Sequence, residues 1–130
     1  MYREIFLPLL LCFAVLLCST SAYAAKQQAG GDDIGKAEND YQLYCISCHG
    51  RNGDGKGDLA EALSVPPRNH TDATIMSKRT DEQLFKTIRD GGEATGFDSA
   101  MPPHNTILPD DQIRGLVKYV RKLCNCQYTK

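Results

Sequence analysis

The stretch Cys45-Ile46-Ser47-Cys48-His49 decides how this 130-residue chain folds. It places two thiols two residues apart on one turn, with an imidazole directly after the second thiol. Residues 35–44, which precede it, are mostly helix formers, and their apolar members recur at helical intervals. Glycines follow at positions 50, 53, 55 and 57 and predict a loop. The motif is therefore expected where a short helix ends and a glycine-rich loop begins.

The C-x-x-C-H spacing has a chemical purpose. Two thiols at this spacing reach the two vinyl groups of one haem, and the histidine after them projects its imidazole at the iron. A redox-active C-x-x-C would need a preceding strand in a βαβ unit, and a zinc site would need a second ligand pair. Cys124 and Cys126 could supply that pair, but His49 would then have no role. We therefore predict one haem c bound covalently by Cys45 and Cys48, with His49 as an axial ligand.

Length and composition exclude several classes of protein. A chain of 130 residues holds one domain, not a multidomain enzyme. Its 15 basic and 16 acidic side chains give a net charge of -1, and no basic run is present, so binding to nucleic acid is not expected. Six cysteines make up under 5% of the residues, which is below the content of disulfide scaffolds.

The first 24 residues are predicted to be a cleavable signal peptide. Arg3 precedes an apolar run from Ile5 to Cys18 that is too short to span a bilayer, and Ala22-Tyr23-Ala24 provides a small-x-small cleavage site. A retained membrane anchor and lipidation of Cys18 are the alternatives. Export places the mature chain in an oxidising compartment, the periplasm, where residues 25–33 form a flexible leader.

The rest of the chain is predicted to be all-α, with four or five helices and long loops in a domain over 34–126 and a tail over 127–130. A brief helical stretch is expected over 58–63. Thr80 and Gln83 form a capping box for a helix that ends at Gly91-Gly92. The last helix begins near Pro109 or Asp110 and carries a broad apolar stripe of Ile113, Leu116, Val117, Val120, Leu123 and Cys124. No stretch has strand periodicity, and without tryptophan the core is thin, so something else is expected to fill its centre.

Several motifs resemble those of class I c-type cytochromes, in particular bacterial single-haem modules. They are Ala37-x-x-x-Tyr41, Tyr44-Cys45-Ile46-Ser47-Cys48-His49-Gly50, Gly53-Asp54-Gly55-Lys56-Gly57, Pro67-Arg68, Gly91-Gly92, Met101-Pro102 and 116–121. The resemblance covers nearly all of the mature chain. It implies a haem wrapped by helices, with the first and last helices crossing near Ala37, Tyr41 and Tyr119.

The second axial ligand has four candidates: Met76, Met101, His70 and His104. Met101 precedes Pro102-Pro103, so its backbone is extended and is followed by rigid residues that can hold a thioether towards the iron. It also matches the family position. Met76 is the reserve and is expected to fill an apolar gap. Both histidines lie in loops, where exposure to solvent is usual, and His104 is the more credible ligand of the two.

The resemblance also implies residues that support the haem. A carbonyl of the Pro66-Pro67 pair, here assigned to Pro67, would accept a hydrogen bond from the outer nitrogen of His49. Arg68 would face a haem propionate or lie exposed, and Tyr44 would pack against the haem. The glycine loop lacks the strand of a dinucleotide site and the closing glutamate of a calcium loop. Its glycines are interpreted as allowing the backbone to approach the haem.

Together these features predict a periplasmic carrier of single electrons with a His/Met-ligated haem and no catalytic residue. The alternatives are a haem subunit docked permanently to a dehydrogenase or oxidase, and an open-iron protein that binds gases or peroxide. The expected partners are a redox donor and a redox acceptor bound transiently, with membrane contact only through such a partner. Cys124 and Cys126 depart from the family pattern. Cys124 could be a small buried residue, and Cys126 could be free, paired with Cys124 or linked to another chain.

Overall fold

The computed structural model describes residues 33–130, and the predicted signal peptide (1–24) and all of the leader but Asp33 lie outside this range. The N-terminal helix is described over 33–44. It is followed by α2 (Ile46–His49), α3 (Ala73–Met76), α4 (Asp81–Asp90) and α5 (Asp110–Cys124), with 3₁₀ turns η1 (Ala60–Ala62) and η2 (Glu93–Thr95). No strand occurs within residues 33–130, which confirms the predicted all-α fold. In the same part of the chain, no helix has the length and apolar character needed to cross a membrane.

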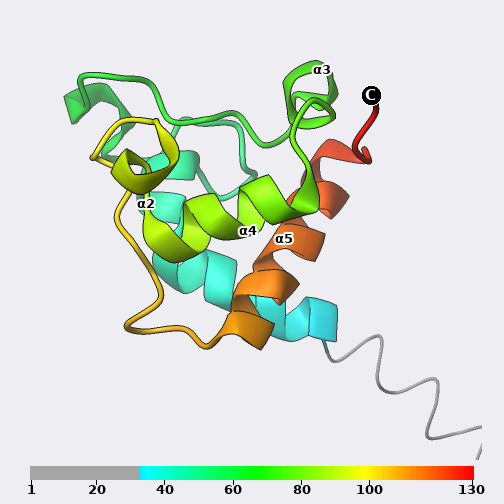
Figure 1. Cartoon of the computed structure of the whole chain (residues 1–130). Coiled ribbons are helices and arrows are strands. Elements are labelled where there is room, and N and C mark those ends of the chain that lie inside the picture. The colour runs from blue at the N-terminus through cyan, green and yellow to red at the C-terminus, as the bar shows by residue number, and fades with distance from the viewer. Residues whose placement is uncertain (1–32) are drawn as a thin grey trace, which may run out of the picture. The chain divides into compact units, whose positions relative to one another are not determined.

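The N-terminal helix and α5 pack together through small and aromatic residues (Figure 1). A Cβ atom on Gly115 of α5 would lie 3.4 Å from the Cβ of Ala37, so the two backbones approach closely there. The rings of Tyr41 and Tyr119 lie 5.1 Å apart between centroids, and both side chains are buried. The crossing that the family resemblance implied is therefore present.

The capping box predicted for α4 is also present. The Thr80 side chain accepts a hydrogen bond from the Gln83 backbone, the Gln83 side chain accepts one from the Thr80 backbone, and Gly91 ends the helix. α4 lies across the front of the view in Figure 1 and packs on α5. Phe85 is buried at this contact, and the Arg114 guanidinium lies 4.0 Å from the centroid of its ring.

α5 begins and ends where its sequence signals predicted. Pro109 is its N-cap, and Asp110 and Asp111 lie in the first turn, where the helix dipole favours negative charge. Asn125 ends it in the left-handed conformation with φ 46°. The predicted stripe is buried except for Leu123, which is partly exposed.

The shorter elements differ from the prediction. The helical stretch expected over 58–63 is reduced to the 3₁₀ turn η1, because extended backbone begins at Leu63 ahead of Val65-Pro66. α3 is not predicted from the sequence, because a helix of four residues is too short to show an apolar period. Its signal is the N-cap Asp72, whose carboxylate accepts hydrogen bonds from the backbones of Thr74 and Ile75.

A buried arginine connects α5 to the chain between α3 and α4. Arg121 donates hydrogen bonds to the backbone oxygens of Met76, at 2.8 Å, and Arg79. It also pairs at 2.8 Å with Asp81, whose side chain is 65% exposed. Because these acceptors satisfy most of its donors, the guanidinium is tolerated in the interior and holds Met76 in place.

The two cysteines that the sequence left open form a disulfide. Cys124 and Cys126 are bonded to each other, with their Cα atoms 5.1 Å apart. Beyond the disulfide, the backbone of Thr129 donates a hydrogen bond of 2.9 Å to the carbonyl of Ser77. The bonded pair is therefore followed by a tail that is tied to the end of α3.

Candidate functional site

A cavity of about 450 Å³ lies among the helices and the loops that join them. This volume is in the range of a cofactor site. Most of its walls are apolar, with Leu116 and Val120 of α5 and Leu84 and Ile88 of α4 among them. The cavity also brings together the predicted site residues, which come from three separate parts of the sequence: Tyr44, Cys45, Cys48, His49, Pro67, Arg68 and Met101.

The C-x-x-C-H motif forms one wall of the cavity. Cys45 follows the N-terminal helix and is the N-cap of α2, so the two thiols and the imidazole follow one another around a single turn. Both thiols are free. Burial raises the pKa of Cys45 to about 12, so its thiol stays neutral, whereas a redox-active C-x-x-C needs a lowered thiol pKa. This environment argues against thioredoxin-like chemistry.

A zinc site is also contradicted. Cys124 and Cys126, the only cysteines that could have completed it within residues 33–130, are bonded to each other. The described part of the chain contains no group of three or more side chains placed to hold a metal ion. The cavity instead offers paired thiols, the imidazole that directly follows them and an apolar lining, which fits a haem attached through both cysteines.

The glycine loop packs closely on the C-x-x-C-H turn. A Cβ on Gly57 would lie 2.4 Å from the carbonyl oxygens of both Ile46 and Ser47, and its backbone N–H donates to the carbonyl of Cys48 at 3.1 Å. A Cβ on Gly55 would lie 2.8 Å from the carbonyl oxygen of Pro67. These glycines therefore allow the loop to wrap the backbone of the motif itself.

His49 is held by a backbone carbonyl, as expected, but not by that of Pro67. Its Nδ1 donates a hydrogen bond of 2.9 Å to the carbonyl oxygen of Arg68, one residue beyond the proline pair. The Pro67 carbonyl faces Gly55 instead. Burial lowers the pKa of His49, so the ring is neutral and Nε2 is the nitrogen left to bind a metal.

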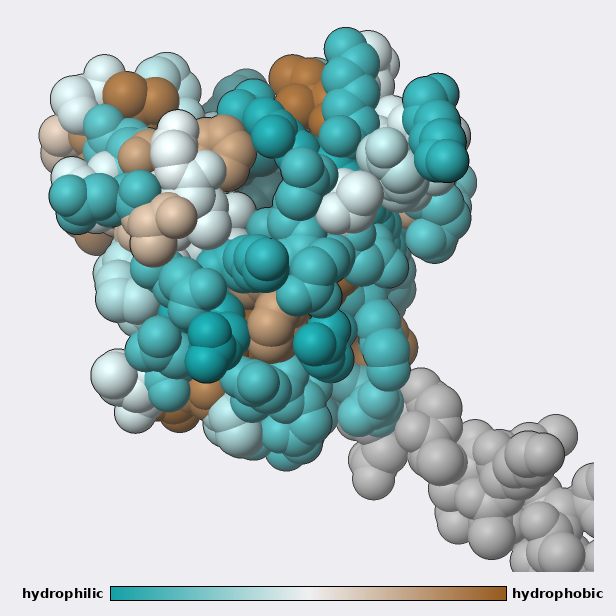
Figure 2. All heavy atoms as spheres, viewed as in Figure 1, coloured by the Kyte–Doolittle hydropathy of each residue, from teal (hydrophilic) through white to brown (hydrophobic). Residues whose placement is uncertain are grey.

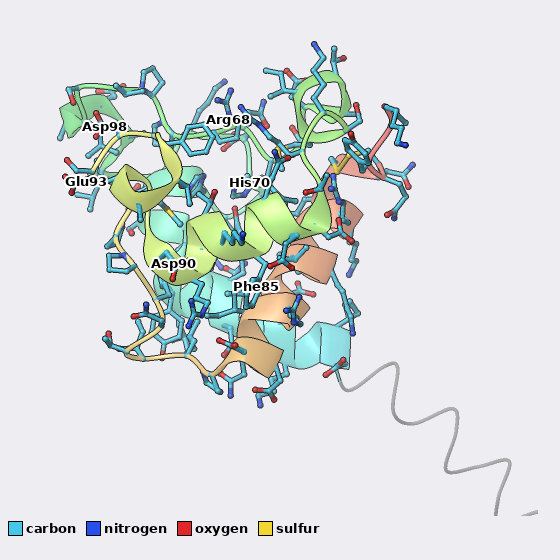
Figure 3. All side chains as sticks on the ribbon, viewed as in Figure 1. Arg68, His70, Phe85, Asp90, Glu93 and Asp98 are labelled. Atoms are coloured by element: carbon cyan, nitrogen blue, oxygen red, sulfur yellow. A yellow bond between two sulfur atoms is a disulfide. The ribbon has the colours of Figure 1, made fainter. Side chains whose placement is uncertain are left out.

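His70 is not the solvent-exposed histidine that its loop position suggested. Its ring stacks on His49 with centroids 4.1 Å apart and planes 18° apart, and the Tyr41 hydroxyl lies 3.0 Å from its Nδ1. Figure 3 shows His70 with Arg68 on the loop that passes above α4 in the view. Tyr41 and His70 are 29 residues apart, so no local spacing rule could have connected them.

Met101 lines the cavity on a segment that is fastened to the end of α4. Its carbonyl accepts a hydrogen bond of 2.9 Å from the Gly92 backbone, and its own backbone N–H donates to Asp98. A Cβ on Gly92 would lie 2.0 Å from the carbonyl oxygen of Asp98. Gly92, the second residue beyond α4, thus makes room for the loop that carries Met101.

The other ligand candidates also lie at the cavity. Met76 is a buried member of the hydrophobic core, as predicted, and its side chain reaches the cavity wall. His104 is only 5% exposed, contrary to the solvated position expected for it. Its Nδ1 donates to the carbonyl of Ile88 at 3.2 Å, and its ring meets that of Tyr44 edge to face at 6.5 Å. Tyr44 is 40% exposed at the rim, and Arg68 is exposed.

The chain is similar to a known protein family and to individual proteins. Residues 32–120 match the family described as cytochrome C oxidase, cbb3-type, subunit III. Among curated proteins, the chain is 29% identical over 90 residues to the dehydrogenase subunit of the quinone-dependent alcohol dehydrogenase of Acetobacter aceti. That similarity covers 69% of this chain and 10% of the relative, so the chain spans about a tenth of the length of that subunit.

Two solved structures have a similar fold and a similar sequence. The KustC0563 c-type cytochrome has a TM-score of 0.55 and 29% identity, with 67% of this chain and 95% of that chain covered. The Kuenenia stuttgartiensis reducing HAO-like protein complex Kustc0457/Kustc0458 has a TM-score of 0.56 and 26% identity, with 68% and 41% covered. The fold is therefore shared with a protein whose chain is nearly all matched and with part of a larger redox complex.

The close approach at Gly92 gives a stability prediction. Gly92→Ala should lower the free energy of unfolding by about 1–3 kcal/mol, because the new methyl group meets backbone that cannot move without displacing the Met101 segment. Gly35→Ala is the control, since nothing lies within 4 Å of its Cβ position, and a helical alanine there should stabilise by up to about 1 kcal/mol. Denaturant unfolding measures both. Equal changes in the free energy of unfolding for the two variants would contradict the close packing at Gly92.

Proposed function

Because the chain belongs to the family of cytochrome C oxidase, cbb3-type, subunit III, and is a class I c-type cytochrome with covalently bound haem c, we propose that it is a periplasmic one-electron carrier whose iron is bound by His49 and Met101. The observation that carries the proposal is the composition of one cavity. It contains two free thiols, an imidazole anchored through Nδ1 and a methionine on a separately fastened segment.

Haem supplies an iron that gains and loses one electron. The residues of the chain hold it and set its surroundings. Cys45 and Cys48 attach it through thioether bonds, and the Arg68 carbonyl keeps the proton on Nδ1 of His49, which leaves Nε2 for the iron. The apolar walls exclude water, and a Met101 thioether favours ferrous iron relative to a second imidazole.

Ligation of the iron by both His49 and Met101 would suit electron transfer better than substrate chemistry, because it would leave no coordination position open. Apolar side chains at the cavity provide the area for brief contact with a partner. Leu59 is 51% exposed and Val65 is 50% exposed. Figure 2 shows hydrophobic residues interspersed with hydrophilic ones around η1, at the upper left of the view. Encounters between redox proteins are of the small class, below about 1,200 Å².

The ligand assignment is tested by two methionine variants. The ferric wild-type protein should show the near-infrared band of methionine bound to iron. Met101→Ala should abolish the band, because the thioether is gone, whereas Met76→Ala should keep it and lose stability through the cavity left in the core. Absorption spectra of the ferric proteins give the answer. A band that persists in Met101→Ala would overturn the assignment.

Export is proposed from the sequence of residues 1–24. Expression in a bacterium that can attach haem c should yield a periplasmic protein that begins at Ala25 and carries one haem. Intact mass under denaturing conditions measures both properties, since a covalent haem stays attached. The double variant Cys45→Ser, Cys48→Ser is the control and should lose the haem mass. A retained N-terminus would contradict cleavage, and a wild-type mass without haem would contradict the attachment.

A haem subunit docked permanently in a larger complex is the second candidate function. It is favoured by the relatives, which include a dehydrogenase subunit and part of a multiprotein redox complex. Size-exclusion chromatography of a native periplasmic extract, followed by the haem absorbance, separates the two functions. A free carrier should elute as a single small chain at moderate salt. Elution only with larger proteins would replace the carrier by the docked subunit.

A further inference from the structure

A second imidazole supports His49 from its face. The His49 and His70 rings are nearly parallel, with centroids 4.1 Å apart, while Nδ1 of His49 donates in the plane of its ring to the Arg68 carbonyl. The hydrogen bond fixes one edge of the His49 ring, but the ring could still tilt about an axis through Nδ1. A ring stacked on its face blocks that tilting from one side.

His70 is itself held in place by three contacts. The Tyr41 hydroxyl lies 3.0 Å from its Nδ1, and its backbone N–H donates to the carbonyl of Gly53 at 2.6 Å. The Tyr41 ring also meets it edge to face, with centroids 5.9 Å apart. Gly53 has φ +76°, and a Cβ there would lie 3.3 Å from Cβ of His70 and 3.4 Å from the Tyr41 hydroxyl. The absence of a side chain at Gly53 therefore leaves room for His70 and Tyr41.

The Tyr41 hydroxyl that meets the His70 ring belongs to a buried side chain. Burial raises the pKa of Tyr41 far above its usual value, so the phenol keeps its proton and shares a hydrogen bond with Nδ1 of His70. The contact therefore holds the His70 ring without adding a negative charge beside it.

We propose that His70 and Tyr41 are positioning residues that fix the plane of the His49 imidazole, and through it the orientation of the axial ligand on the haem iron. The proposal rests on the proposed role of His49. It connects the crossing of the N-terminal helix and α5, where Tyr41 is buried against Tyr119, to the ligand. Both residues act through His49, and neither is proposed as a ligand of the iron.

The test uses the haem-loaded protein and three variants: His70→Ala, His70→Phe and Tyr41→Phe. Proton NMR of the ferric protein reports the ligand plane, because the spread of the haem methyl shifts depends on it. His70→Ala should lose the single set of methyl shifts and give several sets or broadened ones. His70→Phe should retain one set, since a flat ring still covers His49. Tyr41→Phe should shift the set, because the His70 ring loses its hydrogen-bond partner.

Rescue and stability measurements distinguish a role of His70 in orienting the His49 ring from a role in fold stability alone. His70→Phe should keep the single set of shifts, because its ring fills the space behind His49, although loss of the hydrogen bond to Tyr41 leaves its thermal stability lower than in the wild type. If His70→Ala lowers the melting temperature while its methyl shifts match the wild type, the positioning role is overturned. If the wild-type ferric protein has no low-spin haem signal, the proposed ligation by His49 fails first, which is a different outcome.

Discussion

The close crossing of the N-terminal helix and α5 is the constraint on which the rest of the structure depends. Gly115 has no side chain where it meets Ala37, so the two helices approach closely, and Tyr41 packs on Tyr119 beside that point. The crossing sets the position of Cys45, because the N-terminal helix runs directly into it. It also orients α5 so that Leu116 and Val120 line the cavity. The position of Cys45 and one wall of the cavity are therefore set by the same contact.

Different contacts hold the two sides of the cavity in place. On the side of His49, the glycine loop wraps the C-x-x-C-H turn, and the Arg68 carbonyl holds the imidazole. On the side of Met101, Gly92 at the end of α4 binds the segment through its backbone. α4 in turn packs on α5, and Arg121 ties α5 to the chain before α4. Electron transfer benefits from this division, because a rigid surround on both sides limits rearrangement when the charge of the iron changes.

All three histidines of the chain lie at the cavity, yet only one of them could be assigned from the sequence. Each has Nδ1 in a hydrogen bond with a neighbouring oxygen. His49 differs because it follows the two thiols directly. His70 and His104 lie in loops with no periodic pattern, and polar loops usually face water, so the expectation of exposure was reasonable and wrong. Contacts between residues far apart in sequence cover both rings.

The sequence by itself determined the attachment motif, the helical class and the ends of α4 and α5, because these depend on spacing, periodicity and caps within a few residues. It also indicated Met101 as the ligand candidate through the prolines that follow it. The tertiary structure alone decided which carbonyl binds His49, which ring stacks on it, and that Cys124 pairs with Cys126. The two outcomes at His49 depend on differences of one residue or a few ångströms between segments that meet only after folding, and no local rule for a chain encodes such distances. The disulfide depends on the left-handed conformation of Asn125, which lies between the two cysteines.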